Sequence, residues 1–260
     1  MSAEHYDSII IGSGAGGAAA AHRLTAGGQQ VLLLDKGPVL ARKNDTLDPQ
    51  RVVHEGYYKS KEIWSDARGN SVVPEEYFNV GGKTKWYGAA LLRFAANEMT
   101  ADPMFAYRDW PVGEAALEPY YAAAEQLLVV RTFPCEPVLE RIVQTLTTRA
   151  GWTAFSLPMG LSPRILDTPA EAAHFDGFAS PTGMKADAEY SFIDRARGTG
   201  RLTLIANAPV VELLSEGART LTITGVRTAN GASYRASRVL LAAGALHSPR
   251  LLEQYLHTLA

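Results

Sequence analysis

The amino-acid sequence predicts an α/β fold with a doubly wound sheet, and three features of the chain predict it. A buried strand at 6–11 runs into a glycine-rich turn and an alanine-rich helix. A second apolar strand follows at 31–34, and another at 239–242 precedes a further helix. Strands that alternate with helices are typical of α/β folds. With 260 residues, 47% of them hydrophobic, the chain can bury a substantial core.

The first 35 residues form a complete βαβ unit by this reading. Tyr6–Ile11 contains three successive isoleucines and predicts a buried strand, and the helix continues to Ala26. Gly27 and Gly28 then stop the helix. The second strand, 31–34, ends on Asp35.

The middle of the chain predicts connections and two helices. Residues 36–80 are rich in proline, glycine and charge, which indicates long connections with short strands. One apolar stripe predicts a helix with Pro119 in its first turn: Leu117, Tyr120, Tyr121, Ala124, Leu127 and Leu128. A second stripe predicts a helix that Gly151 caps: Leu139, Ile142, Val143 and Leu146.

The last third of the chain predicts mostly strands. Between 152 and 195 no period is clear, which indicates an irregular excursion. Asn230-Gly231 indicates a hairpin turn. Buried or alternating patterns predict strands at 202–206, 210–214, 222–228 and 239–242, and Ser248-Pro249 predicts the start of the last helix.

The glycines of the first turn match G-x-G-x-x-G in the setting that makes the motif informative. Gly12 allows a tight turn, Gly14 lets backbone approach a pyrophosphate at the helix N-terminus, and Gly17 lets helix and strand pack closely. Asp35 at the end of the next strand suits the hydroxyls of an adenosine ribose. This motif alone does not separate NAD from FAD.

A second glycine segment, Val80-Gly81-Gly82-Lys83-Thr84-Lys85-Trp86-Tyr87-Gly88, can press backbone against a flat ring and a diphosphate. With the opening βαβ unit, Asp109-Trp110-Pro111 and the run 241–249, it resembles the glucose-methanol-choline (GMC) family of FAD-dependent oxidoreductases. The resemblance extends in order over nearly the whole chain. An NAD-dependent dehydrogenase is disfavoured, because it leaves the segments at 81–82 and 243–244 without a role.

The resemblance implies a Rossmann-like FAD-binding domain from residues 1–150 and 196–260, with 151–195 as an insertion that begins a substrate-facing region. The implied reaction is oxidation of a CH–OH group in an alcohol or sugar by hydride transfer to the flavin. The residues implied to bind FAD are Gly12, Gly14, Ala15, Gly16, Gly17, Asp35, Lys36, Gly81, Gly82, Thr84, Tyr87, Gly88, Val210, Ala243 and Gly244. Tyr87 is a departure, because many members have asparagine there, and Trp86 argues against a covalent histidine link to the flavin.

The resemblance also implies that a catalytic base is missing, since the family takes its histidine from a C-terminal half that this sequence does not contain. We assign no catalytic residue to the six histidines present, and His247 is the least improbable exception. Three origins remain open: an expressed fragment, a product shortened by truncation or frameshift, or one subunit of a split enzyme. The alternative function is a non-catalytic FAD-binding subunit or remnant that needs a second polypeptide.

Composition disfavours other classes. The 25 basic and 27 acidic residues give a formal net charge of −2, so no nucleic-acid partner is expected. No apolar run predicts a membrane span, and residues 1–5 lack signal-peptide features, so a cytoplasmic location is expected. The single cysteine, Cys135, cannot form an internal disulfide, and no histidine spacing indicates a metal site. The substrate, the electron acceptor and the oligomeric state are not assigned.

Overall fold

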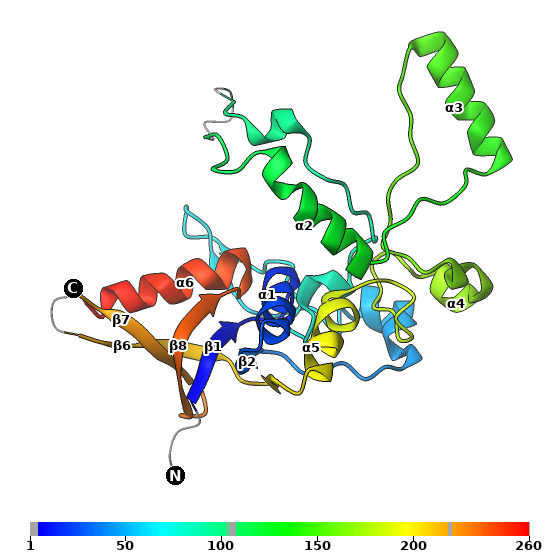
Figure 1. Cartoon of the computed structure of the whole chain (residues 1–260). Coiled ribbons are helices and arrows are strands. Elements are labelled where there is room, and N and C mark those ends of the chain that lie inside the picture. Colours follow the sequence, from blue (N-terminus) through cyan, green and yellow to red (C-terminus); the bar gives the residue numbers. More distant parts are fainter. Residues whose placement is uncertain (1–4, 103, 105–107, 218–219, 260) are drawn as a thin grey trace.

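The protein is described from a computed structural model that covers residues 5–102, 104, 108–217 and 220–259. Its centre is a six-stranded sheet in the order β5-β2-β1-β8-β7-β6 (Figure 1). β1 pairs in parallel with β2 and β8, and β2 pairs in parallel with β5, whereas β6, β7 and β8 pair antiparallel. The strands are β1 His5–Ile11, β2 Val31–Leu34, β5 Leu202–Ile205, β6 Val210–Glu216, β7 Thr222–Thr228 and β8 Ser233–Leu241.

The isoleucines of β1 divide the core between the two faces of the sheet, because successive side chains of a strand point to opposite faces. Ile10 packs with Ala18 and Ala21 of helix α1 (Ala15–Ala26). On this face Phe192 and Ile193, directly before helix α5 (Asp194–Gly198), complete the cluster.

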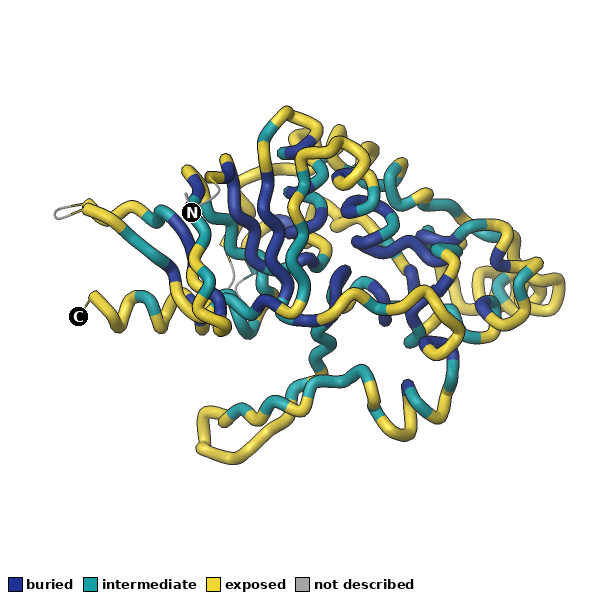
Figure 2. The backbone as a smooth tube through the Cα atoms, turned by 90° about the horizontal axis from the view of Figure 1, so that it is seen from below, coloured by how far each residue is buried: buried dark blue, intermediate teal, exposed yellow. Residues whose placement is uncertain are grey.

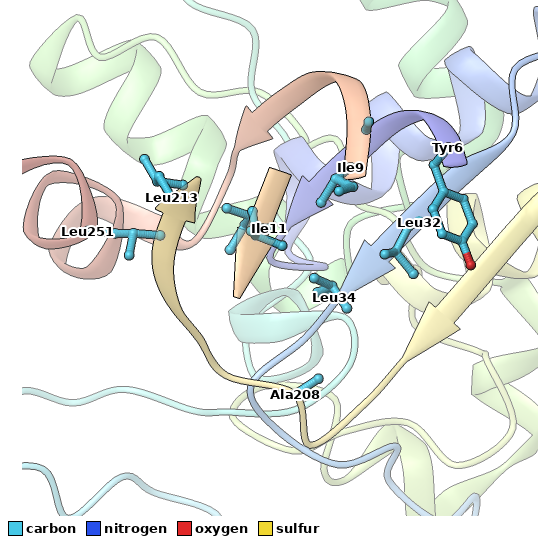
Figure 3. Close-up of a cluster of buried hydrophobic side chains, with 10 residues drawn as sticks. Tyr6, Ile9, Ile11, Leu32, Leu34, Ala208, Leu213 and Leu251 are labelled. Carbon is cyan, nitrogen blue, oxygen red and sulfur yellow. The ribbon is translucent and has the colours of Figure 1, made fainter. Parts of the chain in front are cut away.

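Ile9 and Ile11 belong to the cluster on the other side of the sheet (Figure 3). Leu213 of β6 and Leu251 of helix α6 (Gly244–His257) close this cluster. The sheet is therefore covered on both faces, as a doubly wound fold requires.

Two helices project from this body. α2 (Glu114–Leu127) and α3 (Pro137–Ala150) have no buried residue, and Figure 1 shows both standing away from the sheet. Figure 2 shows that the buried backbone gathers in the strands at the centre of the molecule. The remaining elements are short: α4 Pro169–Ala172, strands β3 Trp64–Ser65 and β4 Ser71–Val72, and single-turn 3-10 or π segments at Asn44–Leu47, Gln50–His54, Gly82–Lys85, Ala96–Met99, Pro163–Asp167 and Glu189–Ile193.

The α/β class, the opening βαβ unit and the glycine caps at Gly27 and Gly151 are confirmed. Three predictions of detail were wrong. β8 begins at Ser233, because its first half pairs with β7 across the predicted hairpin turn. α6 begins at Gly244 and not at Ser248, since Ala242 ends the ladder by donating to the Ile11 carbonyl and the chain turns at once into the helix.

The third correction concerns α2. The helix starts five residues before Pro119, so this proline lies in the second turn. Its predicted stripe is covered only in part: Tyr120 is 71% exposed and Leu117 and Tyr121 are half-buried. Leu127 and Leu128, at the end of the helix, pack against the cluster around Ile10. The segment 152–195, predicted to be irregular, contains several short helices and bridges.

Candidate cofactor site

The first glycine turn lies where β1, β8 and α1 meet, and glycine is required there by contact. Gly12 has φ +97°, and a Cβ on it would overlap the carbonyl oxygen of Ala242. A Cβ on Gly17 would overlap the carbonyl oxygen of Gly12. These two glycines let the turn pass between the neighbouring strand and helix.

Gly14 and Gly16 lie on the open side of the same turn. A Cβ on either residue would have no atom within 4 Å, and Ala15 and Gly16 are exposed. Gly14 is the N-cap of α1, no side chain caps the helix, and its first turn contains no acidic residue. The N-terminal N–H groups of α1 therefore face space that suits an anion such as a diphosphate.

The structure brings the second glycine segment against the first. The backbone N–H of Gly81 donates to Ser13 Oγ at 3.0 Å. A Cβ on Gly82 would lie 3.1 Å from the Cα of Gly14. Gly81 and Gly82 both have positive φ, at +90° and +57°. The two motifs, nearly 70 residues apart in sequence, thus form one glycine-lined surface.

Asp35 is buried beside this surface and is already bonded to the protein. One carboxylate oxygen accepts from the N–H of Ser13 at 3.0 Å and from the Ser13 hydroxyl, and the other accepts from Gly37 N–H at 2.8 Å. Burial raises the pKa of Asp35, while the bonds from Ser13 and Gly37 act to lower it. Asp35 thereby holds the first glycine turn, a role that the sequence motif does not indicate.

Lys36, which follows Asp35 after β2, contacts Glu62 and Phe78 and not the first glycine turn. Its ammonium forms an ion pair with Glu62 and lies 4.0 Å above the centre of the Phe78 ring. Glu62 also accepts from His247 Nε2 at 2.9 Å. Burial acts to raise the pKa of Glu62, but the bonds from Lys36 and His247 outweigh it and lower that pKa.

The other residues predicted in the second glycine segment are held in place by hydrogen bonds and close packing with the rest of the chain. Thr84 Oγ1 donates to the Gly81 carbonyl at 2.6 Å and accepts from Ala188 N–H at 2.9 Å. Tyr87 donates its hydroxyl to the Ala186 carbonyl at 2.7 Å, and burial raises its pKa. A Cβ on Gly88 would lie 2.9 Å from Asp176 Oδ1.

The predicted residues late in the chain also approach the first turn. A Cβ on Gly12 would lie 2.9 Å from the Cα of Ala243, and Gly244 follows as the first, exposed residue of α6. Val210 begins β6, two residues after Ala208, whose N–H donates to the Asp35 carbonyl at 2.8 Å. Gly12, Asp35 and Ala243 thus follow the carboxyl ends of β1, β2 and β8, and Gly81 and Gly82 contact the turn that begins at Gly12. Their contacts with FAD stay a prediction.

Several residues that shape this surface were missed by the sequence analysis. Asn79 accepts from Trp86 Nε1 at 3.0 Å and donates to the carbonyls of Val80 and Gly82. Lys85 is buried with Asp187 and Glu189. No local pattern indicates these contacts, because the lysine and the carboxylates are about 100 residues apart in sequence.

Within the ranges that the structure covers, no group of three or more His, Cys, Asp or Glu side chains is arranged to hold a metal ion. None of the helices in those ranges combines the length and the apolar character that crossing a membrane requires.

Comparison with known proteins agrees with this geometry. Along nearly its whole length the chain is 24% identical to 2-methyl-1,2-propanediol dehydrogenase of Mycolicibacterium austroafricanum (96% of this chain, 51% of that protein) and to oxygen-dependent choline dehydrogenase of Brucella melitensis biotype 1 (95% and 47%). It is 32% identical to 6'''-hydroxyparomomycin C oxidase of Streptomyces lividus over 48% of this chain and 23% of that protein. The chain spans about half the length of the first two relatives.

The fold is shared with a solved structure, that of pyridoxine 4-oxidase from Mesorbium loti. The two superpose with a TM-score of 0.61 at 17% sequence identity, over 96% of this chain and 51% of the other. The model of the FAD dependent oxidoreductase family (DAO) matches residues 7–259, a span that includes both glycine motifs. The chain belongs to this family of FAD-dependent oxidoreductases, and it corresponds to the FAD-binding half that its resemblance to the GMC enzymes predicts.

Proposed function

We propose that the chain is the FAD-binding portion of an oxidoreductase that oxidises a CH–OH group of an alcohol or sugar. The observation that carries this proposal is the single surface formed by Gly14, Gly16 and Gly82 beside the uncapped N-terminus of α1. Backbone there is free of side chains on the side that a diphosphate would approach. The residues present therefore fit an FAD whose pyrophosphate lies at the start of α1.

The chain's residues have distinct parts in this proposal. The N–H groups of Ala15 and Gly16 would bind the pyrophosphate, and Asp35 and the start of β6 at Val210 would hold the adenosine. Gly81, Gly82, Thr84 and Gly88 would orient the flavin, with Ala243 and Gly244 closing the turn. Bound FAD would supply the acceptor for the hydride that leaves the carbinol carbon.

The names of the relatives support an alcohol as the substrate. One is named as a dehydrogenase of 2-methyl-1,2-propanediol, one as a dehydrogenase of choline and one as an oxidase of a hydroxyparomomycin. Each of these substrates carries a hydroxyl group. We therefore propose a small hydroxylated molecule as the substrate and place the substrate-facing region in residues 151–195, between the two FAD-binding parts 1–150 and 196–260.

The alternative is a non-catalytic FAD-binding subunit that acts only with a second polypeptide. The projecting helices favour it, because α3 exposes Val138, Leu139 and Ile142 at 51–63% with no described residue of the chain covering them. His247, which lies beside the predicted site residue Lys36, is bonded through Nε2 to Glu62. We infer that the base for alcohol oxidation comes from outside this chain.

The experiment that tests the cofactor site is FAD binding by Gly14→Val, with Gly113→Val as its matched control. Both glycines are helix N-caps with open space around the missing Cβ, Gly14 on α1 and Gly113 on α2. Valine should leave both proteins folded by circular dichroism. We expect Gly14→Val to lose FAD, because its side chain would occupy the pyrophosphate position, and Gly113→Val to bind as the wild type does. A folded Gly14→Val protein that retains FAD at wild-type affinity contradicts the placement.

A further inference from the structure

The second glycine segment rests on a buried cluster of three charged side chains. Lys85 Nζ lies 3.0 Å from Asp187 Oδ2 and 2.8 Å from Glu189 Oε2. All three side chains are at most 4% exposed. Because burial strips ions of water, such a cluster is stable only when each charge keeps its partner. The lysine therefore joins two parts of the chain about 100 residues apart.

The same two parts of the chain meet at several other points. We name residues 186–189 (Ala186-Asp187-Ala188-Glu189) the anchoring segment. It donates from Ala188 N–H to Thr84 and accepts the hydroxyl of Tyr87 at Ala186. A Cβ on Gly81 would lie 3.0 Å from Lys85 Cε and 3.5 Å from Glu189 Cβ. Gly81 therefore packs directly on the charged cluster.

The cluster is extended by exposed charges that do not replace the lysine. Arg42 and Arg197 approach Glu189 Oε1 at 3.6 and 3.8 Å, and both are also within 3.1 Å of Asp194. Their side chains are 48% and 39% exposed, so water screens them. Among the described residues, Lys85 is the buried cation that forms ion pairs with both carboxylates. Lys185 is buried as well and interacts with Asp187 electrostatically, but its ammonium donates to backbone carbonyls instead. Without it, two buried carboxylates would face each other beneath the glycine backbone.

We propose that Lys85 is a positioning residue for the cofactor: by pairing with Asp187 and Glu189 it fixes the backbone of Gly81 and Gly82 in the conformation that receives FAD. This inference rests on the proposed function, which places FAD against that backbone. Lys85 itself acts through the glycines and touches no cofactor atom in this proposal. Positive φ at both glycines makes the segment dependent on such support, since glycine backbone is intrinsically flexible.

The test compares the wild type, Lys85→Met and a triple variant. It measures their FAD dissociation constants and the amide hydrogen exchange of residues 81–88 in the absence of FAD. Lys85→Met should raise the dissociation constant by about 10-fold or more, as loss of a supporting contact behind a binding group commonly does. It should also speed exchange in 81–88. The triple variant Lys85→Met, Asp187→Asn, Glu189→Gln removes the unpaired carboxylates and should recover thermal stability while FAD binding stays weak. Recovery of FAD affinity together with stability would show that Lys85 is merely structural and would overturn the proposal.

Glu171→Gln is the matched control, because Glu171 is another buried carboxylate but is bonded to Ser180 and Thr182. It should lower stability and leave both FAD affinity and exchange in 81–88 unchanged. If Lys85→Met binds FAD as the wild type does, the positioning role is wrong. If the wild type binds no FAD, the proposed function fails. Unchanged hydrogen exchange of residues 81–88 in Lys85→Met would separately show that Lys85 does not fix the glycine backbone.

Discussion

At the scale of single residues, Asp35 is bonded within the protein at the same carboxylate that we propose to contact the ribose. Its carboxylate holds Ser13 in the first glycine turn and Gly37 beyond the strand end. A carboxylate oxygen has more than one lone pair, so bonds to the protein leave room for a ligand hydroxyl. The proposed ribose contact and the observed bond to Ser13 can therefore exist together.

We expect Asp35→Ala to weaken FAD binding by about 1 to 3 kcal/mol, because ribose hydroxyls would lose a charged acceptor in a buried place. Ser13→Ala separates the two contacts. It removes the hydroxyl that bonds Asp35 and accepts from Gly81, but it keeps the carboxylate. The affinities are measured by titrating each variant with FAD while the quenching of flavin fluorescence is monitored. Equal losses in the two variants would show that Asp35 acts only through Ser13.

Lys185 is a second residue whose burial has a measurable consequence. It is 1% exposed and donates to the carbonyls of Tyr87, Phe175 and Phe178 at 2.6–2.7 Å. Burial, the largest cause, lowers its pKa from 10.5 to about 8. Between these two pH values the unfolded chain holds a proton that the folded chain has released, so the free energy of unfolding rises with pH.

We therefore expect Lys185 to contribute a rise of up to about 3 kcal/mol in unfolding free energy as the pH increases from 8 toward 10.5. The rise in unfolding free energy ends near pH 10, because burial also raises the pKa of Tyr190 to about 12. Tyrosine then ionises first in the unfolded chain, which lowers the free energy of unfolding as the pH increases further. Urea unfolding from pH 7 to 10 measures the slope. Lys185→Met should lose the rise, while a change at the exposed Lys61 should keep it. Identical slopes in wild type and Lys185→Met would contradict this explanation.

At the scale of elements, helix α1 contains glycines with opposite requirements. Gly17 is buried against the Gly12 carbonyl, whereas Gly16 is exposed with open space around its missing Cβ. Glycine within a helix costs about 0.5 to 1 kcal/mol relative to alanine. The same substitution should therefore have opposite effects at two neighbouring positions.

We expect Gly16→Ala to stabilise the FAD-free protein by up to about 1 kcal/mol, since alanine favours the helix and meets no atom. Gly17→Ala should destabilise it by about 2 kcal/mol or more, because its Cβ would force α1 away from the turn. Thermal unfolding followed by circular dichroism measures both. Equal stability of the two variants would show that the close packing of α1 on Gly12 is not required.

At the scale of the whole molecule, the body and the projecting helices differ in how far their apolar side chains are buried. The sheet is covered on both faces, but α2 and α3 contain no buried residue. Trp152 and Phe155 beyond α3 are 63% and 71% exposed. Apolar surface of this extent is typical of an interaction site. This exposed surface agrees with our proposal that the chain acts with further polypeptide. The chain spans about half the length of the relatives that it matches over nearly its whole length.

We expect the 260-residue chain supplied with FAD to show no measurable oxidation of sugars, primary alcohols or choline, because His247, the described histidine that lies beside Lys36, is bonded to Glu62 and is not free to act as the base. Oxygen consumption and dye reduction measure the two common routes of electron transfer. Activity should appear only when polypeptide equivalent to the second half of the relatives is supplied. Steady turnover by the chain alone that is abolished by His247→Ala would show that the base lies here after all.

The sequence by itself determined the βαβ unit, the glycine turn and the α/β class, because strand and helix periods, the positive φ of Gly12 and the contact of Gly17 with Gly12 are local. It also identified the family, since its motifs are ordered along the chain. Only the tertiary structure decided that the stripe of α2 is at most half-buried, because periodicity shows that a helix has an apolar face but not how completely it is covered. It alone joined Lys85 to Asp187 and Glu189 and Asp35 to Ser13, since pairing between distant charges depends on how the chain folds back on itself.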